Sequence, residues 1–380
     1  MRQDTSSIYY YAGGDEFNGS SVDVQMWDFS GWTRTIYSNR EQQYYTDGAN
    51  HMVNEGTLKL YAQRDTLTRR TIDALPDHDS LFVNEQFYSL NKRKFAFTSG
   101  QLISVESFEM GYFECRFRLS GARGYWPAFW LYSGDPTEEI DIMESKTERA
   151  SSIHIDTHCE KKCDLVQGVF RSKSFGGWVK TKIKFNEGFN VVSCLWMNGK
   201  IRFYVNWHCI GVSRVMFTRP KKLIVNLAVP SNNGPFKPGP KQSDTSGAVF
   251  EVDYIRFFSP DHHKRKTVQF APMHDLKHED QSAIVKSKSR YVYGKKADHL
   301  DNGYFVVVSQ SNKLVYVQLL EDKGREIIRY SLLSRDGQDL LQSGHLSSAE
   351  PAIIGGLRSG EYLLMIEGSE KRLTWPVLVE

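Results

Sequence analysis

In the segment EEIDIME, residues 138–144, three carboxylates fall within six positions, namely Glu139, Asp141 and Glu144. Successive side chains of a β-strand point to opposite faces, so Glu139 and Asp141 share one face while the two isoleucines share the other. Strict alternation would send Glu144 to the isoleucine side. A one-residue bulge near Met143 would return it to the acidic face, and bulges are common beside active sites. The sequence therefore predicts a bulged strand with three acids on one face.

A pair of carboxylates at this spacing suits the cleavage of a glycosidic bond. That reaction needs one ionised carboxylate and one protonated carboxylic acid flanking the bond. Strand positions two apart are separated by roughly 6–7 Å. This favours the roughly 5–5.5 Å carboxyl spacing of a retaining enzyme over the wider spacing of an inverting one. Asp141 adds negative charge beside Glu139, which helps to give the two glutamates different pKa values. A solvated acidic strand edge is the alternative from these residues alone.

Aromatic and histidine side chains flank the acidic segment. Upstream, GYWPAFWLYSG contains Trp126 and Trp130, and downstream, SSIHIDTH places His154, Asp156 and His158 at alternate positions. Alternate positions of a strand share one face. We therefore expect the three acids to lie under aromatic walls, with a second polar strand beside them.

The segments that must position these residues read as strands. Apolar residues alternate with a period of two in GYFECRFRLS, KIRFYVNW, KLIVNLAV and AVFEVDYIRFF, and long helical periods are scarce. This pattern predicts an all-β chain in which residues 1–259 form one large two-sheet sandwich. Residues 260–289 are basic and poor in strand pattern, so we expect a linker there. Strand patterns return in residues 290–380, which we expect to form a small second β-sandwich.

Composition narrows the classes of function. The net charge of +3 arises from 48 basic and 45 acidic residues and gives no field that would favour nucleic acid. No run of about eighteen apolar residues occurs, so we expect no membrane span. The N-terminal residues contain no apolar segment of signal-peptide length. Seven of the eight tryptophans precede residue 208, which places the aromatic excess in the first domain.

Nine blocks of the sequence, taken in order, resemble glycoside hydrolase family 16. They are GGDEFNG, NREQQYYTDGAN with EGTLKLYAQR, FTSGQLIS with GYFECRFRL, YWPAFWL, EIDIME, IHIDTH, IRFYVN, LIVNLAV and EVDYIRFF. The resemblance covers about residues 14–258. It implies a jelly-roll (concanavalin-like) sandwich and a retaining endo-glycoside hydrolase that cuts inside a β-linked polysaccharide.

The resemblance also implies a role for each acid of the cluster. Glu139 is similar to the family nucleophile, Glu144 to the general acid/base, and Asp141 to the acid that supports the nucleophile. It implies no redox or nucleotide cofactor. Some members bind a structural calcium, and Asp253 and Gly56 occupy positions similar to its ligands.

Five further residues match substrate-binding positions of the family. Trp126 and Trp130 match aromatics that line the sugar subsites, although core packing is an alternative role for each. Asn39 and Glu41 match polar positions of the glucan-binding edge, and His158 matches a histidine close to the acid/base. Their implied partner is a polysaccharide.

The implied substrate is a β-1,3- or mixed β-1,3/1,4-glucan, with laminarin leading. The chain departs from the β-1,3-glucanase pattern at Arg40, where a second Asn is frequent, and in residues 230–235, PSNNGP, which lack a cleft Trp. Cations such as Arg40 and Lys161 leave open a sulfated or otherwise acidic galactan. A non-catalytic carbohydrate-binding sandwich would use the aromatic walls without needing three acids.

The spacing of two histidines and two cysteines invites a zinc interpretation. His154, His158, Cys159 and Cys163 fall within ten residues, which is crowded for a tetrahedral site on an extended strand. A disulfide between Cys159 and Cys163 is the preferred alternative. We further expect a monomer that is secreted, periplasmic or at the cell surface, because the C-terminal segment is similar to β-sandwich tails of secreted bacterial polysaccharidases.

Overall fold

The computed structural model of the chain describes residues 7–29, 39–72, 88–134, 138–158, 165–166, 169–170, 175–261, 305–311, 314–319, 328–347, 352–368 and 372–379. Every regular element in these ranges is a β-strand, from β1 to β26, so the prediction of an all-β chain is confirmed. In the same ranges no helix has the length and hydropathy needed to cross a membrane.

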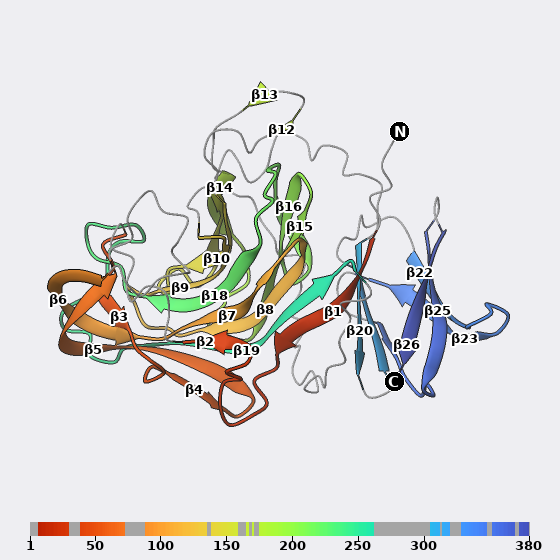
Figure 1. Cartoon of the computed structure of the whole chain (residues 1–380), viewed down its shortest axis with the longest axis horizontal. Helices are drawn as coiled ribbons and strands as arrows, with labels where there is room; N and C mark the ends of the chain where they lie inside the picture. The colour runs from red at the N-terminus through yellow and green to blue at the C-terminus, as the bar shows by residue number, and fades with distance from the viewer. Residues whose placement is uncertain are drawn as a thin grey trace.

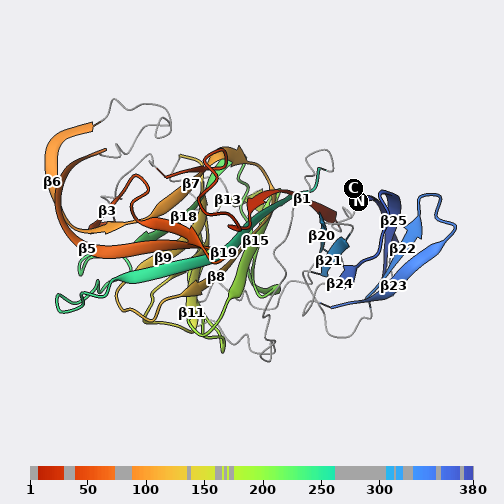
Figure 2. The same cartoon turned by 90° about the horizontal axis from the view of Figure 1, so that it is seen from below.

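Two curved sheets pack face to face in the first sandwich (Figure 1). The outer sheet contains, in spatial order, β17 (His208–Ser213), β16 (Lys200–Val205), β15 (Asn190–Met197), β8 (Gly111–Leu119), β19 (Ala248–Ser259) and β1 (Ser7–Asp15). β5 (Thr57–Ile72) pairs with β19, β4 (His51–Asn54) and β6 (Tyr88–Ser99), and β3 (Gln43–Tyr45) pairs with β6. β5 and β6 extend past the sandwich at the end remote from the C-terminus (Figure 2).

The inner sheet carries the acidic segment. Its order is β14 (Phe175–Lys180), β11 (Ser152–His158), β10 (Glu139–Ser145), β9 (Trp126–Tyr132), β18 (Lys221–Ala228), β7 (Gln101–Phe108) and β2 (Trp27–Asp28). The acidic strand β10 therefore lies between the tryptophan strand β9 and the histidine strand β11. A separate short hairpin pairs β12 (Leu165–Val166) with β13 (Val169–Phe170).

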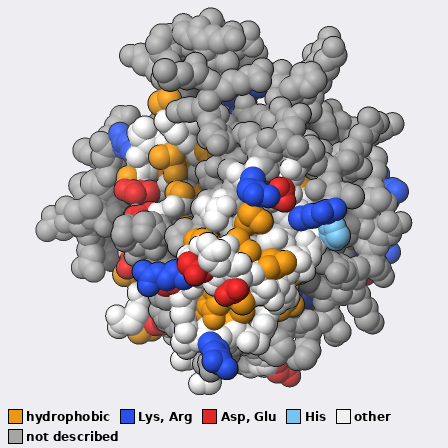
Figure 3. Space-filling view, turned by 90° about the vertical axis from the view of Figure 1, so that its right-hand side faces the viewer, with side chains coloured by type: hydrophobic (Ala, Val, Ile, Leu, Met, Phe, Trp, Pro, Cys, Tyr) orange, Lys and Arg blue, Asp and Glu red, His pale blue; other side chains and the backbone are white. Residues whose placement is uncertain are grey.

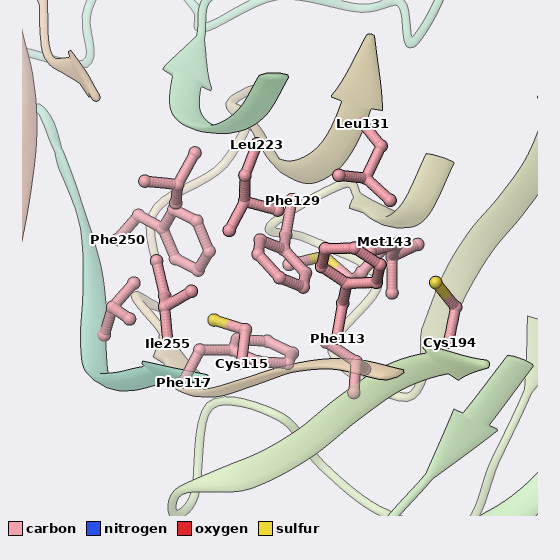
Figure 4. Packing of buried hydrophobic residues seen from close by; sticks show 14 of the residues in the cluster. Phe113, Cys115, Phe117, Phe129, Leu131, Met143, Cys194, Leu223, Phe250 and Ile255 are labelled. Carbon is pink, nitrogen blue, oxygen red and sulfur yellow. The ribbon is translucent and has the colours of Figure 1, made fainter. Parts of the chain in front are cut away.

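The core fills the space between the two sheets. Figure 4 shows Phe129, Leu131, Met143 and Leu223 of the inner sheet facing the side chains of the outer sheet, which are Phe113, Cys115, Phe117, Cys194, Phe250 and Ile255. Every one of them is fully buried. Because alternate positions of each inner strand enter this core, the other positions are fixed on the opposite face.

The last described residues form two further layers of strands around a second hydrophobic core. One layer contains β20 (Phe305–Ser311), β21 (Leu314–Leu319) and β24 (Ala352–Ile354). The other has the order β23 (Leu340–Leu346), β22 (Ile328–Ser334), β25 (Gly360–Glu367) and β26 (Arg372–Val379). The predicted basic linker falls outside the described residues except for its first two positions.

The outer sheet continues from one sandwich into the other. β1 pairs with β19 on one side and, in parallel, with β20 on the other, where Ile8 lies opposite Val306. Figure 1 shows β1 and β20 side by side between the two sandwiches. On the end face beyond them, the described residues carry charges of both signs among hydrophobic side chains (Figure 3).

Candidate active site

The predicted bulge is present in β10. Between Asp141 and Glu144, β10 contains one residue more than each neighbouring strand. The two residues between them, Ile142 and Met143, are both buried in the core. Two consecutive core residues reset the alternation, so Glu144 returns to the face that holds Glu139 and Asp141. The prediction of a bulge near Met143 is therefore confirmed.

Glu138 lies apart from this acidic face. Its carboxylate accepts hydrogen bonds from the backbone N–H groups of Thr218 and Arg219. It also forms an ion pair with Lys221, with 2.8 Å between Nζ and Oε2. Glu138 thus fastens β10 to the segment that precedes β18 and does not join the other three acids.

His158 faces Glu139 and Asp141 from the adjacent strand. Its Nε2 lies 3.1 Å from Asp141 Oδ2 and 3.8 Å from Glu139 Oε1. The hydrogen bond with Asp141 is the largest cause that raises the pKa of His158, to about 10. The imidazole is therefore a cation at neutral pH and offsets part of the negative charge of the two acids.

His154 and Trp126 contact the third acid, Glu144. Trp126 Nε1 donates a hydrogen bond to Oε1 at 3.0 Å, and His154 Nδ1 lies 3.0 Å from Oε2. The sequence resemblance matched His158 to a histidine close to the acid/base, and the charge of His158 does act on Glu144. The direct contact with Glu144, however, comes from His154, four residues earlier on β11.

Burial and mutual repulsion govern the protonation of the acidic face. Burial, followed by the negative charge of Asp141, raises the pKa of both Glu139 and Glu144 well above the usual range. Burial also raises the pKa of Asp156 to about 6. Because buried like charges cannot all ionise together, at least one carboxyl group of the cluster retains a proton near neutral pH. A proton donor and a carboxylate therefore coexist on one face.

An aromatic cluster borders Glu144. The ring of Trp126 stacks on Phe236, with 4.2 Å between centroids and 8° between planes. Trp178 of β14 lies 5.4 Å from Phe236, and His154 meets both rings edge-on. The guanidinium carbon of Arg149 lies 4.7 Å from the centroid of Trp178. These groups form an aromatic wall beside Glu144, in which Trp126 is the aromatic residue that the sequence led us to expect.

Trp130 lies on the acidic face, two positions from Ala128 along β9. Its Nε1 donates to Asn226 Oδ1 at 2.8 Å, and Asn226 donates in turn to Tyr45 Oη at 2.8 Å. Trp130 retains 8% of its exposure and packs beside Tyr132. It therefore has a packing role on this face as well as a small accessible surface.

Asn39 and Glu41 lie next to the segment that leads to Phe236. Arg40 Nη1 lies 3.5 Å from the carbonyl oxygen of Asn233 and donates to it. Glu41 is 1% exposed and accepts hydrogen bonds from Asn39 and Gln43. Glu41 is therefore placed to orient Asn39, and Asn39 is the more accessible of the two.

The residues proposed for calcium do not fit a cation site. The carboxylate of Asp253 forms a close ion pair with Arg116, whose side chain is 6% exposed. A metal cation would have to compete with this guanidinium. Gly56 occupies a turn with φ +72 and offers only a backbone oxygen. No step proposed below passes through calcium.

Among the described residues, one trio brings possible metal ligands within 4.8 Å, namely Glu139, Asp141 and His158. The imidazolium of His158 already supplies positive charge there, so the trio is satisfied as an ion-paired cluster. Cys159 and Cys163 lie outside the described residues, and with them the disulfide and zinc predictions. His154 and His158 contact acids instead of each other.

Sequence reasoning missed Phe236 and Trp178. Phe236 has φ 55, a left-handed backbone conformation that residues other than glycine rarely adopt. It lies in an irregular segment without periodicity, so no pattern marks it. Trp178 stands on a short edge strand, and its tryptophan identity was the only available signal.

Known proteins resemble the chain over about two thirds of its length. It is 27% identical over 269 residues to an endo-1,3-1,4-beta-glycanase of Rhizobium meliloti, covering 65% of this chain and 51% of that protein. It is 25% identical over 288 residues to a glucan endo-1,3-beta-glucosidase of Niallia circulans, covering 64% of this chain and 37% of that protein. The chain thus spans about half or less of the length of these relatives.

The fold resembles that of a solved laminarinase domain. The catalytic domain of an endo-1,3-beta-glucanase (laminarinase) from Thermotoga petrophila superimposes with a TM-score of 0.52 at 22% identity, covering 67% of this chain and 98% of that domain. This supports the jelly-roll sandwich. The family model described as glycosyl hydrolases family 16 matches residues 39–233, just over half of the chain. The chain therefore belongs to glycosyl hydrolases family 16.

Proposed function

We propose that this protein is a retaining endo-glycoside hydrolase that cleaves internal linkages of a β-1,3- or mixed β-1,3/1,4-glucan. The single observation that carries the proposal is the bulge in β10, which brings Glu139, Asp141 and Glu144 to one face. Membership of the family and the names of the relatives support the same class of substrate.

The neighbours of the two glutamates suggest their division of labour. Glu139 lies 3.8 Å from the His158 cation, which favours its ionised form as the nucleophile. Glu144 faces His154, whose pKa is lowered by burial, so no cation offsets the charge of Glu144 from that side. Its pKa is raised by burial, which suits a proton donor.

The proposed reaction has two displacements. Glu139 attacks the anomeric carbon while Glu144 protonates the leaving oxygen, which gives a glycosyl-enzyme. Glu144, now ionised, then removes a proton from water as the water releases the sugar. Asp141 holds His158 and so maintains the charge balance beside Glu139.

Replacement of either glutamate by glutamine tests this assignment. We expect Glu139→Gln and Glu144→Gln each to lower kcat on laminarin or lichenan at least about 100-fold, since each removes a group that donates, accepts or attacks. Reducing-end assays with product mapping measure this effect. Glu138→Gln is the matched control, because Glu138 bonds away from the acidic face.

Three results would contradict the proposal. Full turnover by either variant would remove that residue from the mechanism. If NMR shows that the first-formed product has the inverted anomeric configuration, Glu139 cannot be the nucleophile. Binding of sugars by a wild-type protein that cuts none of laminarin, lichenan, agarose, carrageenan or xyloglucan would favour a non-catalytic binding sandwich.

A galactan that carries sulfate or carboxylate groups is a second candidate substrate. Arg149 is exposed, and its guanidinium lies over the ring of Trp178, at the end of the aromatic cluster that begins beside Glu144. A guanidinium in a cation–π contact still has N–H donors to offer to an anion. Lys161, the other cation that suggested such a substrate, lies outside the described residues.

Arg149→Gln distinguishes the two substrate classes. If the substrate is anionic, the variant should lose about 10-fold in kcat/KM on a sulfated galactan, the order expected from one charge-assisted hydrogen bond. On neutral laminarin the same variant should retain its activity. A loss on laminarin equal to that on the galactan would mean that Arg149 supports Trp178 and does not bind anions.

We also propose that one chain suffices, because the acids and their neighbours all come from the same sheet. Polysaccharides are too large to cross a cytoplasmic membrane intact. We therefore propose a secreted, periplasmic or cell-surface location.

A further inference from the structure

Both carboxyl oxygens of Glu144 have a nitrogen partner at 3.0 Å. Trp126 Nε1 can only donate, and it donates to Oε1. His154 Nδ1 faces Oε2 and can either donate or accept, depending on the tautomer. The role of His154 therefore decides how the proton of Glu144 is held.

His154 is fixed in place by rings on two sides. Its imidazole meets Trp178 at 64° with 5.4 Å between centroids, and Phe236 at 84° with 5.7 Å. Burial is the largest influence on its protonation and lowers its pKa. At neutral pH the ring is therefore neutral and carries one N–H proton, on either Nδ1 or Nε2. The ring cannot turn without displacing the aromatic cluster.

We infer that His154 is a positioning residue that donates its Nδ1 proton to Glu144 Oε2 in both half-reactions of the proposed double displacement. This inference deepens the proposed function and rests on it. Nothing in the resemblance assigned a role to His154.

Donation from Nδ1 is compatible with both the protonated and the ionised form of Glu144. Each carboxyl oxygen has two acceptor sites, so Oε1 and Oε2 can accept from Trp126 and His154 whether or not Glu144 carries its own proton. If Nδ1 accepted instead, it would hold the acidic proton away from the leaving oxygen. Donation leaves that proton free to point at the sugar.

Donation also limits how far burial raises the pKa of Glu144. A hydrogen bond to the ionised form favours that form. Two donors therefore stabilise the carboxylate that forms as Glu144 gives its proton to the leaving oxygen. Without His154, Glu144 would release its proton less readily, and the first step would slow.

Other titratable groups also act on His154. Asp156 and His158 lie on its own strand, Asp141 lies on β10, and all three influence its pKa. The described neighbours on the remaining sides are Trp178 and Phe236, which do not titrate. Variants at His154 must therefore be compared with Asp141, Asp156 and His158 unchanged.

Two substitutions separate donation from packing. His154→Phe keeps a ring for the aromatic cluster but removes the donor. His154→Asn places an amide N–H near the position of Nδ1. Carboxyl ¹³C NMR of the full chain, with Glu144→Gln to assign the resonance, reports the pKa of Glu144 without any substrate. The pH dependence of kcat/KM on a cleaved glucan reports the same group kinetically.

We expect His154→Phe to raise the pKa of Glu144 by about one pH unit. The basic limb of kcat/KM should move upward by the same amount, and His154→Asn should restore part of both. An unchanged or lowered pKa in His154→Phe would overturn the inference, since it would mean that Nδ1 accepts or has no effect. A fall in kcat with no movement of the basic limb would overturn it as well.

The NMR measurement keeps this test distinct from that of the proposed function. If the wild-type protein cleaves no glycan, the enzymatic proposal fails. The titration of Glu144 still shows whether His154 donates to it.

Discussion

His158 is the only positive group in direct contact with Glu139 and Asp141 among the described residues. Its pKa in the folded protein is about 10, against an ordinary value of 6.5. A folded-state pKa above the unfolded value means that the stabilisation is fully present below pH 6.5 and is lost as the pH rises toward 10. His158→Gln should therefore lower Tm at pH 6 by about 2–4 °C, as expected for a partly exposed ion pair worth about 1 kcal/mol.

Thermal unfolding of both proteins between pH 5 and about 10.5 measures this effect. The difference in Tm should shrink as the pH rises from 6.5 to about 10, because the unfolded chain loses the proton of His158 near 6.5 while the folded protein keeps it until about 10. A difference in Tm that grows with pH would show that His158 is neutral in the folded protein.

At the same residue scale, strand parity allowed the acidic face to be predicted from the sequence. Counting positions placed Glu139 with Asp141, and the need to recover Glu144 implied the bulge. Contacts that depend on the rotation of a side chain were not accessible in this way. Parity puts His154 and His158 on one face but cannot say which of them touches Glu144. Phe236 lies beyond the reach of any period, since its position depends on a left-handed backbone in an irregular segment.

The pairing of β11 with the edge strand β14 requires a residue without a side chain at one position of β14. Gly176 lies opposite Asp156, and a Cβ at Gly176 would overlap the carboxyl group of Asp156. Gly176→Ala should therefore displace Asp156 toward the acidic face and destabilise the protein by about 1–3 kcal/mol, the usual cost of overpacking. Urea unfolding measures the stability, and the kcat of the variant reports the displacement.

A double variant separates this steric cause from a backbone effect. Gly176→Ala combined with Asp156→Ala should regain most of the lost stability, because the overlapping carboxyl group is gone. Gly188→Ala is the matched control, since nothing lies within 4 Å of a Cβ built there. Equal destabilisation in the single and double variants would show that the carboxyl overlap is not the cause.

The strands themselves follow from the two-residue period, but their partners do not. The period predicted β8, β16, β18 and β19, although the structure buries nearly every residue of the first three, and only the first half of β19 alternates in burial. The order of strands in a sheet depends on contacts between segments far apart in the chain. The parallel pairing of β1 with β20 depends on such distant contacts, and no local pattern predicts it.

At the scale of the whole molecule, β1 joins the two sandwiches through successive tyrosines. Tyr10 is buried in the core of the C-terminal sandwich. Tyr9 and Tyr11 instead join a separate cluster with Tyr112, Tyr254 and other side chains of the outer sheet. Since neighbours on a strand point to opposite faces, one strand contributes to two cores, and each core can be weakened separately.

Tyr10→Ala should therefore loosen the C-terminal sandwich while leaving the acidic face intact. Loss of a large buried aromatic side chain costs about 3 kcal/mol or more, so amide hydrogen exchange in β20–β26 should accelerate, whereas β9 and β10 should keep their protection. Tyr9→Ala, the matched control, should accelerate exchange in β8, β15 and β16 instead.

If both variants speed exchange across both sandwiches equally, the two cores unfold as one cooperative unit, and β1 transmits stability between them. If Tyr10→Ala leaves β20–β26 unchanged, the C-terminal sandwich does not depend on β1. The pattern of hydrogen exchange thus decides whether the two sandwiches joined by the continuous sheet unfold independently or as one cooperative unit.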